Sequence, residues 1–123
     1  KALGVADKVI FAGQRTDIPQ LLQAMDIMIF PSLFEALPVS LIEAQASKLP
    51  CLISDTVTFD VKFNDNVDFM SLENSAETWS DKAFELLKIK REDIATDKLK
   101  SVYDISSSAK MLDEIYNTEN YND

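Results

Sequence analysis

Two glutamates, Glu35 and Glu43, are the residues of this 123-residue chain whose type and spacing most clearly suggest chemistry. Seven residues separate them, and Pro38 between them is suited to start a helix. Glu35 therefore precedes the helix N-terminus, and Glu43 lies about a turn and a half inside the helix. Because the surrounding segment is apolar, the two carboxylates predict a polar pocket that can hold a polyhydroxylated, phosphorylated ligand.

The predicted helix at residues 38–49 carries a narrow polar stripe made of Ser40, Glu43 and Ser47. Most of its remaining circumference is apolar, which is typical of a buried helix, and a buried carboxylate needs a partner. The same stripe would also suit an ordinary solvated face, and Glu35 would also suit the positive end of the helix dipole. The helix pattern alone leaves both interpretations open.

Alternating strands and helices are predicted to position this pocket. Four short apolar runs predict strands, and they lie at residues 9–12, 27–30, 51–54 and 67–72. Helical periodicity between them, from Ile18 and at residues 38–49, indicates βαβ units on a parallel sheet. The runs are apolar throughout, so both sheet faces are expected to be covered. The predicted fold class is α/β, a three-layer Rossmann-like parallel sheet with flanking helices, in one domain over residues 1–123.

Two further helices are predicted after the last strand. Ser75 is suited to cap the first, and Asp104 is suited to cap the second. The apolar stripe of the first helix consists of Trp79, Ala83, Leu86 and Leu87. The residues expected to face inward on the second are Ile105, Ser108, Ala109, Leu112, Ile115 and Tyr116.

Composition excludes several function classes. A formal net charge of −9 argues against nucleic-acid binding and against docking on anionic lipid. The absence of histidine removes catalytic triads and histidine-ligated metal sites, and Cys51 lies in an apolar run typical of a buried structural thiol. No apolar run approaches the about 18 residues of a membrane span. The expected setting is cytoplasmic and reducing.

Backbone N–H groups around Leu37, Val39 and Ser40 favour phosphate binding. They lie where a predicted parallel strand ends and a helix begins. Open α/β sheets bind their ligands at that edge, and helix N-termini bind phosphates.

A resemblance to a known family is carried by the segment FPSLFEALPVSLIEAQASKLPCLISD. It is similar to the signature segment of family 4 retaining glycosyltransferases, which have the GT-B fold and an E-x7-E motif. The similarity continues upstream in VIFAGQRTDIPQLLQAMDIMIFPS and downstream in DTVTFDVKFNDNVDFMSLENSAETW. The downstream stretch is especially like transferases of bacterial capsular and exopolysaccharide synthesis. Specific motifs cover about residues 1–87.

The resemblance implies a role for each site residue. Glu35 would be the catalytic residue that faces the donor sugar and stabilises charge as the bond between sugar and phosphate breaks. Glu43 would accept hydrogen bonds from the two ribose hydroxyls of the nucleotide. The other donor-binding positions would be Ala36, Leu37 and Val39 at the sugar and diphosphate, and Gly13, Gln14 and Arg15 at the nucleobase.

The resemblance also implies the ligands and partners. The donor would be a nucleotide diphosphate sugar, expected to be a UDP-sugar. No metal or other cofactor would be needed, because a helix N-terminus and basic side chains would stabilise the diphosphate. The acceptor would be a saccharide or lipid-linked molecule held by an N-terminal domain outside this chain, which would also provide any association with the inner face of the membrane. This chain alone is therefore expected to be inactive, and the full-length enzyme to be a hexosyltransferase.

Two positions depart from the family pattern, which usually has glycine where this chain has Ala36 and Lys48. Ala36 adds a methyl group beside the donor sugar and penalises a positive φ. Lys48 is the milder change, because a cation suits a helix C-terminus. A degenerate, non-catalytic interaction domain is therefore one alternative. A phospho-receiver with Asp26 or Asp55 as acceptor is another, although the expected acidic pair and lysine are missing.

Sheet topology gives a further expectation. By resemblance, the four strands would be the third to sixth of a sheet ordered 3-2-1-4-5-6, and their connecting helices would cover one face only. An open apolar face would exceed what a soluble monomer tolerates. The helices after Asp93 are expected to fold back across it, and a homodimer with a second copy covering it is the alternative.

Overall fold

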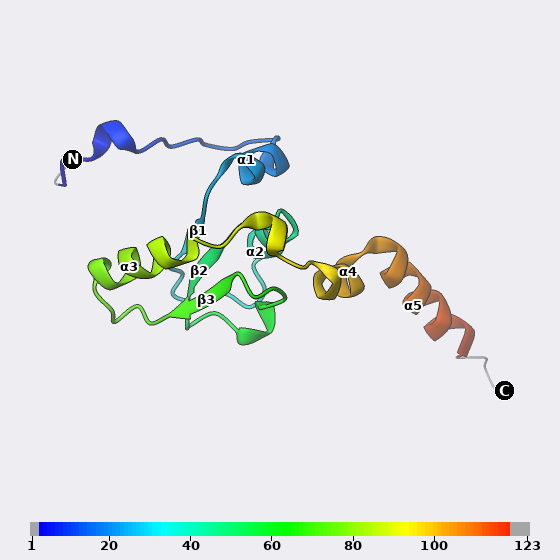
Figure 1. Cartoon of the computed structure of the whole chain (residues 1–123). Helices are drawn as coiled ribbons and strands as arrows, with labels where there is room; N and C mark the ends of the chain where they lie inside the picture. Colours follow the sequence, from blue (N-terminus) through cyan, green and yellow to red (C-terminus); the bar gives the residue numbers. More distant parts are fainter. Residues whose placement is uncertain (1–2, 119–123) are drawn as a thin grey trace.

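Three parallel strands form the sheet in the computed structural model, which describes residues 3–118 (Figure 1). The strands are β1 (Met28–Phe30), β2 (Cys51–Ser54) and β3 (Val67–Met70), in the order β1-β2-β3. In the register, Met28 lies opposite Cys51, which in turn lies opposite Val67. The predicted strands at 27–30, 51–54 and 67–72 are therefore confirmed, with shorter ends in the first and last.

Five α-helices and three short 3-10 turns complete the described part of the chain. The helices are α1 (Ile18–Ala24), α2 (Val39–Ala46), α3 (Ala76–Leu86), α4 (Asp97–Tyr103) and α5 (Ile105–Thr118). The 3-10 turns are η1 (Ala6–Lys8), η2 (Phe59–Val61) and η3 (Arg91–Asp93). The α4 helix was not predicted.

Helices cover both faces of the sheet, as the three-layer prediction requires (Figure 1). On one face, Leu22 of α1 and Leu41 of α2 pack with the buried side chains of Cys51 and Ile53. On the other, Leu52 packs against Ala83 and Leu86 of α3. The second face is not left for the helices after Asp93 to cover, because α3 turns back onto it after β3. The α/β class is confirmed.

The predicted strand at residues 9–12 is wrong. This segment is irregular and runs apart from the sheet, with Ile10 and Phe11 89% and 94% exposed (Figure 1). Apolar composition gives a segment strand propensity, but a strand forms only where a neighbouring strand accepts its hydrogen bonds. The residues of β1 pair with β2, and β3 lies on the far side of β2.

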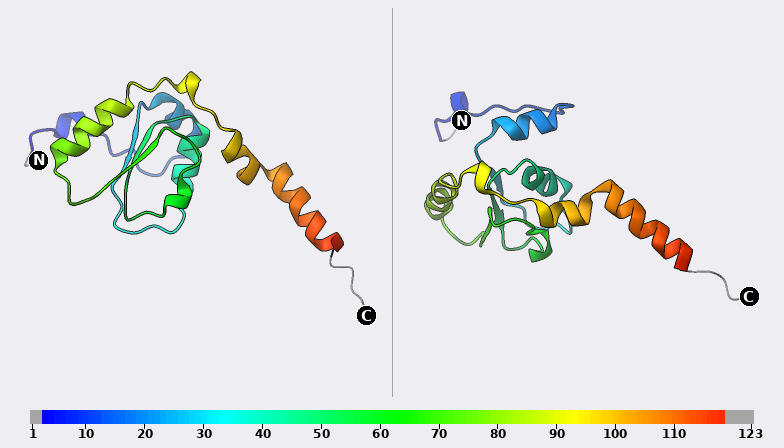
Figure 2. Two further views of the ribbon diagram at one scale, coloured as in Figure 1. Left: turned by 60° about the horizontal axis from the view of Figure 1, so that its bottom comes forward. Right: turned by 45° about the vertical axis from the view of Figure 1, so that its right-hand side comes forward.

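The expected docking of the C-terminal helices on the sheet is also wrong. Asp104 caps α5 as predicted, since its Oδ2 accepts a hydrogen bond from Ser107 N at 3.1 Å. However, α5 points away from the sheet in both views of Figure 2, and Ile105 and Tyr116 are 82% and 72% exposed. Because α3 already covers the face that α5 was expected to fill, the apolar stripe of α5 does not pack there.

The two other predicted helix ends are well defined. Ser75 caps α3 by accepting a hydrogen bond from Thr78 N at 3.2 Å. At the end of α2, Lys48 has φ 56° and donates to Gln45 O, while Leu49 N donates to Ala44 O, both at 2.9 Å. This is the Schellman arrangement, in which the left-handed residue is usually glycine. The glycine that the family usually has at this position would adopt this positive φ without steric cost.

Gln45 of α2 is fully buried and makes four hydrogen bonds. Its Nε2 donates to Val61 O at 2.8 Å and to Leu41 O at 3.2 Å. Its Oε1 accepts from Phe63 N at 3.0 Å and from Asn64 N at 3.2 Å. One side chain thus joins α2 to the loop that leads into β3, and it satisfies backbone groups that have lost contact with water.

We expect Gln45→Leu to lower the free energy of unfolding by at least about 3 kcal/mol, because it strands two N–H groups and a carbonyl, each costing roughly 1–3 kcal/mol. Urea unfolding followed by circular dichroism measures the change. Gln20→Leu, at an exposed position of α1, is the matched control and should change stability by less than about 0.5 kcal/mol. A loss below about 1 kcal/mol for the Gln45 variant would contradict the role given to its hydrogen bonds.

Burial raises the pKa of the Cys51 thiol to about 12 from an ordinary value of 9.0. Its Sγ lies 3.2 Å from Leu49 O, and the side chain is fully buried in the core. The predicted structural role of this cysteine agrees with that position, because the reactive species is the thiolate.

We expect Cys51 to resist a disulfide reagent such as dithionitrobenzoate at pH 8 in the folded protein and to react once urea unfolds it. Since the folded pKa is the higher one, the thiol favours folding below about pH 9, and this contribution is lost as the pH rises toward about 12. Ser106→Cys, which places a second thiol on the exposed α5, controls for reagent activity. Rapid modification of Cys51 without unfolding would contradict its burial.

Candidate functional site

The loop between β1 and α2 is held at the carboxyl edge of the sheet by the last residue of β2 and the chain that follows it. Ser32 O accepts hydrogen bonds from Ser54 Oγ and from Thr56 Oγ1, the latter at 2.7 Å. Glu35 then forms a parallel bridge with Val57. Two loops that leave neighbouring strands are therefore joined side by side, and Glu35 lies where they meet.

The start of α2 presents uncapped backbone donors at this edge. Its N-cap residue is Pro38, which makes no side-chain capping hydrogen bond. The N–H groups of the first turn therefore have no capping side chain at this position. Glu35 is half-buried, whereas Ala36, Leu37 and Val39 are exposed beside the helix start. Aligned N–H groups and the positive end of the helix dipole favour an anion at this place.

The backbone of Ala36 does not have a positive φ, so a residue other than glycine fits there without strain. Among the described residues, Lys48 is the one non-glycine residue with a positive φ. The concern that alanine at position 36 would strain a left-handed backbone therefore does not apply. The added methyl group remains exposed on the surface of the loop.

Glu43 lies on the exposed side of α2, facing α1 across a cavity of about 180 Å³. The residues that line the cavity are Ile18, Pro19 and Leu22 from α1, and Glu43, Ala46 and Ser47 from α2 and its C-cap. Of the two interpretations that the helix pattern left open, the structure favours the solvated face, since α2 buries one side only, through Leu41, Ala44 and Gln45. Glu43 is thus a solvated carboxylate at the mouth of a mainly apolar cavity.

Gly13, Gln14 and Arg15 do not line this cavity. They belong to the exposed segment before α1, where Gly13 has φ 65°. Arg15 pairs with Asp17 at 2.6 Å, and this hydrogen bond lowers the pKa of the Asp17 carboxyl below its usual value. The role of these three residues at a nucleobase stays a prediction.

Three residues whose hydrogen bonds join the elements around the two glutamates had no recognisable signal in the sequence. Ser54 and Thr56 hold the loop through Ser32 O, across 22 and 24 residues of sequence. Arg91 hydrogen-bonds to the end of α1 from 66 to 69 residues away. Hydrogen bonds over such separations depend on how the chain folds, and no local pattern encodes them.

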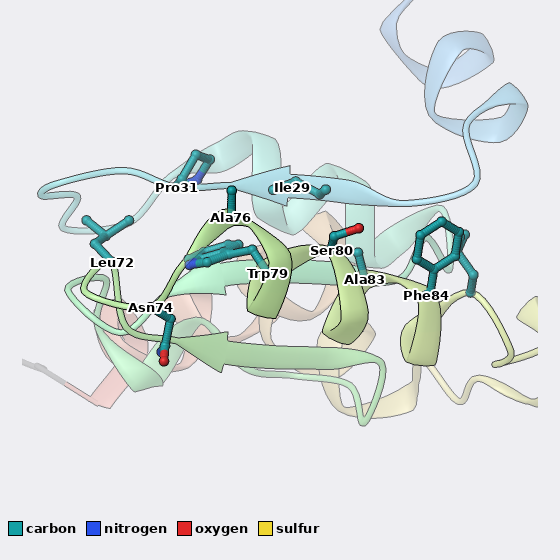
Figure 3. A pocket seen from close by; sticks show the side chains of 10 residues that line it. Ile29, Pro31, Leu72, Asn74, Ala76, Trp79, Ser80, Ala83 and Phe84 are labelled. Atoms are coloured by element: carbon teal, nitrogen blue, oxygen red, sulfur yellow. The ribbon is translucent and has the colours of Figure 1, made fainter. Parts of the chain in front are cut away.

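A second, larger cavity of about 570 Å³ lies between β1 and α3 (Figure 3). Ile29 and Pro31 form one wall, and Trp79, Ala83 and Phe84 of α3 form the other. No charged residue lines it, and the indole N–H of Trp79 donates to Ser71 O at 3.1 Å. Because a sugar nucleotide needs many polar partners, this apolar cavity suits such a ligand poorly despite its size.

The described residues 3–118 contain no cluster of three or more histidine, cysteine, aspartate or glutamate side chains arranged to hold a metal ion. Across the same residues, no helix is both long enough and apolar enough to span a lipid bilayer.

Comparison with known families identifies the family of this chain. The family model described as "Glycosyl transferases group 1" matches residues 1–101 of this chain. The chain belongs to the group 1 glycosyltransferases. The matched range includes both glutamates, α1, α2 and Arg91.

Similar curated proteins agree with this family. The chain is 36% identical over 113 residues to the putative glycosyltransferase EpsF of Bacillus subtilis. This match covers 89% of this chain and 29% of that protein. It is 38% identical over 53 residues, 43% of the chain and 14% of the relative, to an Escherichia coli UDP-Gal:alpha-D-GlcNAc-diphosphoundecaprenol alpha-1,3-galactosyltransferase. The lipopolysaccharide core biosynthesis mannosyltransferase LpsB of Rhizobium meliloti is 32% identical over 56 residues, 46% of the chain and 16% of the relative. No solved structure matches the chain significantly.

This group 1 glycosyltransferase chain thus spans less than a third of the length of these relatives. Within it, the paired carboxylates of the E-x7-E motif lie on either side of the α2 N-terminus, one in the loop and one on the exposed helix face. The resemblance to family 4 enzymes of the exopolysaccharide type is confirmed.

We expect Glu43→Ala, in the enzyme that contains this chain, to weaken donor binding by roughly 1.5–3 kcal/mol, the range for hydrogen bonds to a charged group. Isothermal titration with UDP measures the effect. Glu85→Ala, an exposed glutamate on α3 at the other sheet face, should leave the dissociation constant unchanged. An unchanged constant for the Glu43 variant would remove this carboxylate from the nucleotide site.

Proposed function

We propose that this chain is the donor nucleotide-sugar-binding part of a retaining hexosyltransferase that extends a polysaccharide or lipid-linked acceptor. The observation that carries the proposal is the α2 N-terminus, uncapped at the carboxyl edge of the sheet with Glu35 before it and Glu43 after it. A sugar nucleotide has hydroxyls at both ends and a diphosphate between them. Carboxylates on both sides of a phosphate-binding helix start match that order of groups.

In this proposal the diphosphate lies at the first turn of α2. The N–H groups of Val39 and Ser40 and the positive end of the helix dipole stabilise the negative charge that grows on the phosphate as the sugar leaves. Electrostatic stabilisation of this kind needs no metal ion, and we propose metal-independent transfer.

The two glutamates act at opposite ends of the donor. Glu35, held by the bridge to Val57, faces the sugar and stabilises positive charge that develops at the anomeric carbon. Glu43 accepts hydrogen bonds from the ribose hydroxyls, and the cavity it shares with α1 takes the rest of the nucleoside. Ala36 and Leu37 then border the sugar from the loop, and Gly13, Gln14 and Arg15 are proposed at the base.

The names of the relatives support the donor and acceptor classes. One relative carries a UDP-Gal donor and a diphosphoundecaprenol acceptor in its name. We propose a UDP-sugar as donor, and a saccharide or lipid-linked acceptor that binds to parts of the protein outside this chain. With such substrates, we propose that the enzyme works in the cytoplasm, at the inner face of the membrane. Since the net charge of −9 repels a dianionic ligand, the chain alone binds its donor weakly.

The test is Glu35→Gln, assayed for sugar transfer in the enzyme that contains this chain. If Glu35 stabilises the transition state, kcat should fall by more than tenfold while KM for the donor changes little. Glu77→Gln, an exposed glutamate in the first turn of α3, is the matched control and should leave both constants unchanged. An effect confined to KM would make Glu35 a binding residue, and a native enzyme that binds UDP without transfer would support the non-catalytic alternative.

A further inference from the structure

Arg91, which begins η3 after α3, donates hydrogen bonds to three carbonyls at the end of α1. Its Nη1 donates to Gln23 O at 3.2 Å, and its Nη2 donates to Leu22 O at 3.1 Å and also to Met25 O. The side chain is half-buried. A residue from the C-terminal half of the chain thus occupies the carboxyl end of a helix from the N-terminal half.

This contact suits the chemistry of both partners. The last carbonyls of a helix receive no hydrogen bond from an N–H group of the same helix. They also lie at the negative end of the helix dipole. A guanidinium is permanently charged and presents several donors in a planar fork, so one side chain can serve several carbonyls.

The α1 helix has few other sources of stability. It is seven residues long, it buries one residue, Leu22, and its N-cap Asp17 makes no side-chain capping bond. Short helices are marginal in water unless tertiary contacts hold them. The Arg91 hydrogen bonds therefore provide a substantial part of what fixes α1 against the domain.

The position of α1 in turn sets the width of the candidate nucleotide cavity. Its residues Ile18, Pro19 and Leu22 form the wall opposite Glu43. Arg91 itself lines an adjoining cavity of about 290 Å³ with Gln23 of α1. The two cavities share Ala46 and Ser47, so Arg91 lies at the other end of the same α1–α2 gap.

We propose that Arg91 is a positioning residue for the donor site, which holds α1 at the distance from α2 that leaves the cavity beside Glu43 open and preformed. This inference rests on the proposed function. Arg91 does not contact the nucleotide in this account. Its effect on affinity passes through α1, because a wall that must be ordered on binding weakens the ligand's apparent affinity.

The experiment compares Arg91→Met, Arg91→Lys and Lys90→Met in the enzyme that contains this chain. Amide hydrogen exchange reports the opening of α1, and NMR titration with UDP gives the dissociation constant. Arg91→Lys keeps the positive charge but loses the planar guanidinium with its several donors. Lys90, exposed and 3.9 Å from Glu92, is the matched neighbouring cation.

We expect Arg91→Met to speed exchange in α1 and to weaken UDP binding, each by about tenfold or more, while exchange in α2 and α3 stays as in the native chain. Arg91→Lys should retain most of both defects, and Lys90→Met should show neither. If Arg91→Met fails to fold, Arg91→Lys decides the question. Ethylguanidinium, added to Arg91→Ala, should partly restore α1 protection and UDP affinity, and ethylammonium should not.

Four results would overturn the proposal. Unchanged exchange in α1 would show that the hydrogen bonds do not hold the helix. Faster exchange with unchanged UDP affinity would show that Arg91 has a structural role only. Native exchange and native affinity in Arg91→Lys would show that a positive charge is sufficient and that the planar guanidinium is not needed. A native enzyme that shows no response to UDP overturns the proposed function and the positioning role together, while the exchange data still report separately whether Arg91 holds α1.

Discussion

The buried amide of Gln45 is the interaction on which the candidate site depends most. It fixes α2 to the loop before β3 through hydrogen bonds to Val61, Phe63 and Asn64. Because α2 is short and buries only one side, its orientation over the sheet is set by that side. Where Gln45 lies inward, Glu43 must lie outward, about 200° around the helix, on the side that faces α1.

A second set of contacts fixes the other end of the site. Ser54 and Thr56 both donate to Ser32 O, which joins the loops after β1 and β2. The α2 N-terminus is therefore defined from two directions, by its buried side and by the loop that enters it. A site for an extended ligand such as the proposed sugar nucleotide needs both sets of contacts. They keep the part of the site that binds the sugar at a constant distance from the part that binds the ribose.

Much of this arrangement could be predicted from the sequence where the information is local. The apolar run of β2, the caps at Ser75 and Asp104 and the spacing of the two glutamates all reflect neighbours a few residues apart. They identified the fold class and the helix ends correctly, and the roles of the two glutamates stay a prediction.

The errors share a physical cause, which is that they concern partners distant in sequence. Residues 9–12 have strand composition but no neighbouring strand in the sheet, and α5 is amphipathic but finds its expected face covered by α3. Gln45 is a polar residue, and it lies in the core. Burial of a polar side chain depends on whether distant backbone groups can satisfy it, and the helix pattern carries no information on that.

The most direct test of the central claim is an NMR map of this chain with two ligands, UDP and uridine. The account predicts that both ligands shift signals around Glu43 and α1, and that only UDP shifts the amides of Val39 and Ser40, because only UDP places phosphate at the α2 N-terminus. Shifts that gather instead around Trp79 and Phe84 in the apolar cavity, or α2 amides that respond equally to uridine, would contradict it.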